Sequence, residues 1–196
     1  MLRDTRELTG YAIAAKDGRI GHVSDFFFDK DDWVMRYLVV DTRKWLLREH
    51  ALLATAIVEA VDSEQQEILM PVTKDQVHKS PDAENIMLIS REAELQLMKY
   101  WNWAPYWTGT PMGPVVGNDA ASAATTEERE MAEDTTESYL RSVKQVLDYK
   151  VLAENGELGN VAGFACDETW RIKYILVATR HWTPDRTVYV PREDVW

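Results

Sequence analysis

Several features that would assign a function are absent or scarce in this sequence of 196 residues. A single cysteine, Cys166, excludes an internal disulfide framework and favours a reducing compartment. No run of about 18 apolar residues occurs, so no membrane-spanning helix is expected. The N-terminal stretch also lacks the apolar region of a secretory signal. These absences together predict a cytoplasmic protein without a membrane span.

Positive charge is also scarce. The 22 Lys and Arg residues are outnumbered by 33 Asp and Glu residues, which gives a net charge of −11. A nucleic-acid partner is not expected, because phosphate binding needs clustered basic side chains. Residues 118–138 hold seven acidic residues and one Arg, so more than half of the net charge lies in one short segment. Such a composition is typical of a solvated linker.

Motifs that carry chemistry are missing as well. The sequence has no Gly-x-Ser-x-Gly, no phosphate-binding loop and no dinucleotide fingerprint. The acidic run at 29–32 lacks the spacing of a calcium loop and is interpreted as a hairpin turn. Cys166 is expected to be a core thiol, and no histidine lies at metal-ligand spacing; the four histidines are His22, His50, His78 and His181. We therefore predict no catalytic, cofactor-binding or metal-binding residue, and no enzyme activity.

What the sequence does contain is an internal repeat. WVMRYLVVDTRKW at 33–45 is followed much later by WRIKYILVATRHW at 170–182, with six of the thirteen positions identical. Before these stretches, GRIGHVSDFFFD from Gly18 matches GELGNVAGFACD from Gly156 at an offset of 138 residues. A register kept over this length predicts that one structural unit occurs twice.

The repeated unit is predicted to be β. Asp17-Gly18 and Asn155-Gly156 are strong hairpin-turn signals that lie between apolar runs. Alternation predicts that Phe26 and Phe28 share a face with Ile20, and that Met35 shares a face with Tyr37. Residues 50–61 and 67–72 fit further strands, the first with a helical alternative. Thr73 is expected to cap a short helix that ends near residue 79.

The two copies differ at their ends. The first copy continues into the predicted strand 67–72, whereas the second reaches Trp196 before any such strand. Three explanations remain open for the strand that is missing from the second barrel. The chain is shortened, another segment of the same chain closes the edge, or another protomer closes it by strand addition.

Between the copies, residues 90–101 predict a helix that is capped by Ser90. An aromatic cluster follows, and it has two interpretations: packing back over the first barrel, or an exposed contact patch for a partner. Its residues are Trp101, Trp103, Tyr106 and Trp107. The predicted organisation is a first barrel at 1–81, a helix and aromatic extension at 82–107, an acidic flexible linker at 108–141 and a second barrel at 142–196.

The first copy resembles the PRC-barrel family, and its stand-alone bacterial members in particular. The resemblance covers roughly residues 5–107 and 142–196, and it includes the run Pro71-Val72-Thr73-Lys74-Asp75-Gln76-Val77. The other residues that carry it are Gly18, Gly21, Val23, Asp25, Trp33, Arg36, Tyr37, Leu38, Val39, Val40, Asp41, Thr42 and Trp45. It implies a mostly β fold with two small barrels, and a role in protein contacts and assembly without established catalytic residues.

Two classes of function follow from these observations. The first is a non-enzymatic interaction or assembly module that forms a homodimer or joins a larger protein assembly. The alternative is a small-ligand-binding or enzymatic protein with a site in or between the barrels. The best candidate for such a site is the polar cluster of Asp41, Arg43 and Arg180, for which a structural ion pair at a strand end is the simpler interpretation.

Overall fold

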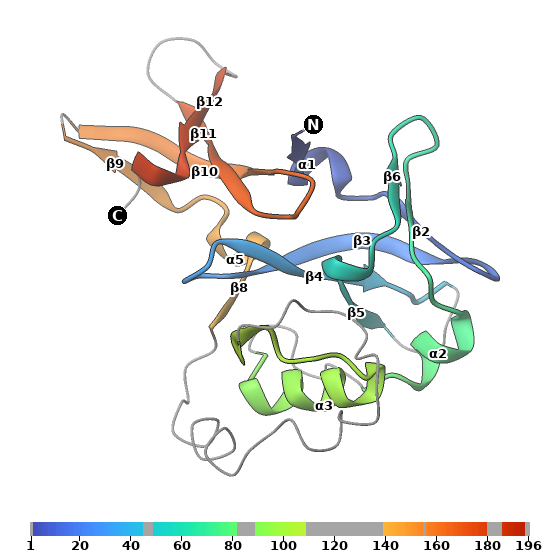
Figure 1. Cartoon of the computed structure of the whole chain (residues 1–196). Helices are drawn as coiled ribbons and strands as arrows, with labels where there is room; N and C mark the ends of the chain where they lie inside the picture. Colours follow the sequence, from blue (N-terminus) through green and yellow to red (C-terminus); the bar gives the residue numbers. More distant parts are fainter. Residues whose placement is uncertain are drawn as a thin grey trace.

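The computed structural model describes residues 2–44, 49–81, 89–108, 139–154, 156–179 and 186–194. Trp45, Asn155, Arg180 and most of the predicted linker lie outside these ranges. The protein is mostly β, as the sequence predicts, and its strands form two sheets (Figure 1).

The first sheet has the strand order β5-β4-β3-β2-β7-β6, and β8 also pairs with β3. Its strands are β2 (Ala12–Ala15), β3 (Gly18–Asp29), β4 (Val34–Asp41), β5 (His50–Ala54), β6 (Ala60–Asp62), β7 (Glu67–Leu69) and β8 (Leu140–Ser142). All of these pairs are antiparallel except β2 with β7. The parallel pair joins the first strand of the copy to its last part.

The second sheet has the order β1-β10-β11-β12, with β9 also on β10, and every pair is antiparallel. Its strands are β1 (Arg3–Asp4), β9 (Lys150–Ala153), β10 (Gly156–Cys166), β11 (Ile172–Thr179) and β12 (Arg186–Pro191). The helical segments of the chain are α1 (Thr5–Leu8), η1 (Thr55–Ile57), α2 (Lys74–Lys79), α3 (Arg91–Trp101), η2 (Tyr106–Thr108), α5 (Val143–Val146) and η4 (Arg192–Asp194). No helix in the described ranges is long and apolar enough to cross a membrane.

The predicted local signals are confirmed. The turn at Asp17-Gly18 joins β2 to β3. The side chain of Asp29 accepts hydrogen bonds from two backbone N–H groups of the 29–32 run, which makes that run a hairpin turn. Thr73 forms a capping box with Gln76 at the start of α2, and Ser90 caps α3. These features depend on neighbours in sequence, which is why a pattern could predict them.

Strict alternation along β3 and β4 was a wrong prediction. Bulges interrupt the β3–β4 pairing between Val23 and Asp25 and again between Phe27 and Phe28. Each bulge adds a residue on one strand and moves the following side chains to the other face. Val23 therefore joins Phe26 and Phe28 in the main core, and Met35 lies there rather than beside Tyr37.

Two apolar cores result. The larger one lies inside the first sheet and continues into the second, where it includes Cys166 as the predicted buried thiol. The smaller core lies on the opposite face of β4 and β5, where α3 covers the sheet (Figure 1). Its members include Tyr37, Val39, Leu52, Leu97, Met98, Trp103 and Tyr106.

The two copies exchange their first segments. β1 and α1, from the N-terminus of the first copy, lie on β10 of the second copy, and Arg3 is opposite Cys166. β8 and α5, from the start of the second copy, lie on β3 of the first, and Arg141 is opposite Phe28 (Figure 1). The two pairings are equivalent at the offset of 138 residues. The predicted division into two separate barrels at 1–81 and 142–196 did not anticipate this exchange.

Candidate interaction site

The predicted polar cluster is a local ion pair at the end of β4. Arg43 Nη2 lies 2.5 Å from Asp41 Oδ2, and the Arg43 side chain is 62% exposed. The hydrogen bond from Arg43 lowers the pKa of Asp41 to about 2. Arg180, the third predicted member, lies outside the described residues. An exposed pair between residues two apart can form without any ligand.

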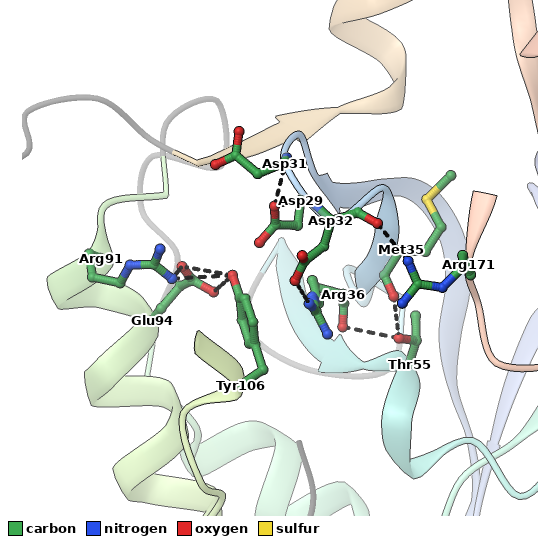
Figure 2. A network of polar contacts seen from close by, with 10 residues as sticks. All are labelled: Asp29, Asp31, Asp32, Met35, Arg36, Thr55, Arg91, Glu94, Tyr106 and Arg171. Atoms are coloured by element: carbon green, nitrogen blue, oxygen red, sulfur yellow. Dashed lines mark hydrogen bonds and ion pairs between the residues drawn. The ribbon is translucent and has the colours of Figure 1, made fainter. Parts of the chain in front are cut away.

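A buried carboxylate on α3 forms the most connected polar group in the first half. Glu94 is 2% exposed and accepts hydrogen bonds from the hydroxyls of Tyr37, at 3.0 Å, and Tyr106, at 3.1 Å. Arg91 Nη1 lies 3.2 Å from the other carboxylate oxygen. Figure 2 shows Arg91, Glu94 and Tyr106 converging from α3 and the segment that follows it. The network connects α3 to β4 through Tyr37.

Burial sets the protonation of this cluster. Loss of water raises the pKa of Glu94 to about 7, although Arg91 and the two tyrosine hydroxyls oppose the shift. Burial also raises the pKa of Tyr37 and of Tyr106, so both phenols stay protonated and can donate. The arrangement has donors for one carboxylate and no nucleophile, so we interpret it as an anchor for α3.

The predicted aromatic cluster lies beside this anchor. Trp103 and Tyr106 are buried in the smaller core, and the Trp101 ring stacks on Trp103 at 5.4 Å. Arg36 lies over the Tyr106 ring at 3.8 Å, and Arg91 lies over Trp107 at the same distance. The packing interpretation therefore describes Trp103 and Tyr106. Partner contact by Trp101 and Trp107, which are only partly buried, stays a prediction.

The exchanged segment on β3 is held by a buried aspartate. Asp25 accepts a hydrogen bond of 2.5 Å from the Ser142 hydroxyl, and one of 3.1 Å from the backbone N–H of Lys144. It also accepts from the N–H of Phe26 at 2.8 Å. Burial raises the pKa of Asp25, and the bond from Ser142 opposes that shift. One carboxylate thus joins β3 to both β8 and α5.

The equivalent place in the second sheet uses different groups. Gly163 stands where β3 has Asp25, and a Cβ at Gly163 would come within 2.9 Å of Arg6 Cγ. Arg6 instead pairs with Asp4, the equivalent of Ser142, at 2.6 Å. The hydroxyl of Thr5 accepts the N–H of Phe164 at 3.0 Å and replaces the missing carboxylate. The two contacts are therefore not interchangeable.

The second sheet is less completely covered than the first. In the first half, β7 and α2 place four buried apolar residues over the core: Ile68, Met70, Val72 and Val77. In the part of the chain that the structure describes, no strand pairs with the outer edge of β9, the equivalent of β2. Ile13 and Ile20 are fully buried, whereas their equivalents Val151 and Leu158 are only partly buried. The second half thus keeps the apolar residues but lacks the cover.

Exposed apolar side chains gather at this place. Seven large hydrophobic residues are exposed in the described chain, and four of them lie at β9 or β12: Tyr149, Leu152, Val188 and Tyr189. Leu152 is 75% exposed. Sequence reasoning missed these four residues. Their only signal was the absence of a second strand like 67–72, which indicated an open edge but not its position.

Comparison with known families agrees with the architecture of the first half. Residues 4–77 match the model of the PRC-barrel domain. The chain contains one PRC-barrel domain. The matched region runs from β1 through α2, so it includes both the β1–α1 segment that lies on the second sheet and the β7–α2 segment that covers the first. A search of the curated proteins found no match to the chain.

In the described residues, no group of three or more His, Cys, Asp or Glu side chains is placed to hold a metal ion. The feature that most resembles a functional site is therefore a surface. It consists of the open edges of β9 and β12 and the apolar residues beside them, and we name it the open face. Its exposed residues are Tyr149, Leu152, Val188 and Tyr189.

Proposed function

We propose that this protein is a non-enzymatic interaction module that self-associates through the open face. The second half is interpreted as a divergent PRC-barrel copy that another polypeptide completes. The observation that carries the proposal is the pair of matched positions, Ile13 against Val151 and Ile20 against Leu158. Each is fully buried in the first half and partly exposed in the second. Leaving apolar surface in water costs about 25 cal/mol per Å², so cover is favourable.

Charge supports a second copy of the chain as the partner. Residues 139–196 contain eight Lys or Arg and eight Asp or Glu, so this part has no net charge. The whole net charge of −11 therefore belongs to the rest of the chain. Two copies that meet through their second halves bring neutral surfaces together, and their acidic parts can stay apart. A larger assembly built on this homodimer is compatible with the same surface.

The cytoplasm is the location that we propose, because Cys166 is the single thiol and lies buried. A non-enzymatic role is favoured by the contacts of the two buried carboxylates. Glu94 and Asp25 are each fully engaged with donors of the protein itself, and neither faces a nucleophile.

The mass of the full chain in solution tests the proposal. We expect light scattering after gel filtration to give twice the chain mass of 22.6 kDa at micromolar concentration. Leu152→Lys should weaken the dimer about 10- to 100-fold, which corresponds to a loss of roughly 1–3 kcal/mol at a central contact. Leu69→Lys is the matched control, because Leu69 is also exposed but lies on β7 of the covered half. A chain that stays monomeric at every concentration would refute self-association.

A further inference from the structure

The open face has two free edges, and they differ. In the described chain, β9 pairs only with β10, and β12 pairs only with β11. The four strands β9, β10, β11 and β12 are successively antiparallel, so they form an open sheet that ends in β9 on one side and in β12 on the other. An open edge exposes unpaired N–H and C=O groups and favours pairing with another strand.

We propose that β12 of one copy pairs with the β9 edge of a second copy, and that the reciprocal pair forms across a two-fold axis. This inference rests on the proposed self-association and names its contact. Two four-stranded sheets that are joined in this way close into one eight-stranded, antiparallel array. Closure removes both edges at once, whereas pairing of like edges leaves the other two free.

Side chains inside such an array would be the partly buried ones. Val190, Val151, Leu158 and Val161 all pack on the rim of the main core, and Val188 lies beside them at 41% exposure. In the first half, the equivalents of Val151, Leu158, Val161 and Val190 are at most 2% exposed: Ile13, Ile20, Val23 and Leu53. A second sheet placed against this face would supply the cover that β7 and α2 supply in the first half.

Charges beside the two edges favour unlike pairing. β12 begins with the exposed Arg186, and no acidic residue lies within the strand. β9 is followed by the exposed Glu154, and its Lys150 is already paired with Glu157 at 2.9 Å. Pairing β12 with β12 of the other copy would bring two arginines to one edge. Pairing β12 with β9 brings an arginine toward a region with a spare carboxylate.

Cross-linking of mixed variants tests the contact. Leu152→Cys marks β9 and Tyr189→Cys marks β12, and both side chains are exposed, at 75% and 48%. Each variant is purified alone, its dimer mass is checked, and the two are mixed and treated with a short bismaleimide. Cys166 is fully buried, so the added thiol should react first. We expect covalent dimers mainly in the mixture and few with either variant alone.

The other outcomes separate the pairing from self-association. Covalent dimers of Leu152→Cys alone indicate β9 on β9, and those of Tyr189→Cys alone indicate β12 on β12; either result overturns the proposed pairing and leaves the dimer intact. A dimeric mass without cross-linking in any sample also overturns the pairing. A monomeric mass for the wild-type chain overturns both proposals. Leu69→Cys mixed with Tyr189→Cys is the control for random collisions.

Discussion

Trp33 and Trp170 occupy equivalent positions in the two copies, and each accepts a backbone hydrogen bond from the other copy. The carbonyl of Trp170 accepts from the N–H of Met35, and that of Trp33 accepts from Ile172, both at 2.8 Å. Both tryptophans have left-handed backbones, with φ of 56° and 65°. Together with the exchanged segments, these bonds make the two copies one pseudo-symmetric body. Its symmetry fails where the second half lacks a cover.

The first prediction concerns the choice between exchanged and unexchanged segments. Ser142→Asp places a second carboxylate against Asp25, and we expect a loss of about 2–4 kcal/mol in unfolding free energy. Asp4→Ser, the reverse change at the equivalent position, removes only the partly exposed ion pair with Arg6 and should cost under about 1 kcal/mol. Urea denaturation of both variants measures the difference. Equal losses would show that Asp25 does not discriminate between the two segments.

The second prediction is a pH dependence at Glu94. Its pKa is about 7 in the folded protein, above its value in the unfolded chain. The folded state therefore holds a proton that the unfolded state has lost between about pH 4.5 and 7, so this group makes stability fall as pH rises through that window. We expect the stability of the wild type relative to Glu94→Gln to decrease by a few kcal/mol, ~3, between pH 4.5 and 8. Chemical denaturation at several pH values measures it. A difference that does not change with pH would contradict the raised pKa.

The third prediction compares equivalent core positions. Ile13→Ala should cost about 2–5 kcal/mol, because Ile13 is fully buried beneath β7. Val151→Ala should cost less in the dilute chain, because its site is open to water. At concentrations where the dimer forms, the Val151→Ala penalty should grow. Thermal unfolding at two protein concentrations tests this, and a penalty independent of concentration would argue against cover by a second copy.

The fourth prediction concerns the ion pair of Asp41 and Arg43. Arg43→Ala should change the unfolding free energy by less than about 1 kcal/mol, because the pair is exposed and screened by water. It should also leave the dimer mass unchanged, since the pair is not part of the open face. A larger loss of stability, or a change of mass, would indicate a role for Arg43 that the ion pair does not explain.

Sequence reasoning succeeded where the cause is local. Thr73 and Ser90 cap helices by bonds to groups three residues away, and the Asp17-Gly18 turn needs only its own backbone. It failed where the cause lies elsewhere in the chain. The bulge that moves Val23 into the core depends on the register with β4, and no feature within β3 alone reveals it.

The exchange was beyond prediction for a similar reason. The repeat shows that residues near Asp4 and Ser142 are equivalent, but equivalence does not say which sheet receives which segment. That choice depends on Asp25 against Gly163, which the sequence presents only as an unexplained difference between the copies. The burial of Glu94 was also hidden, because its partner Tyr37 lies 57 residues away.

One measurement tests the exchange most directly, and the native thiol makes it possible. Arg3→Cys places a second cysteine opposite Cys166 on the adjacent antiparallel strand, where a disulfide can form. Burial raises the pKa of Cys166 to about 12, so oxidation needs a catalyst such as copper phenanthroline. The account predicts an intramolecular disulfide in Arg3→Cys and none in Arg141→Cys, whose residue lies opposite Phe28. A disulfide in Arg141→Cys, and none in Arg3→Cys, would show that each copy keeps its own first segment and would contradict the account.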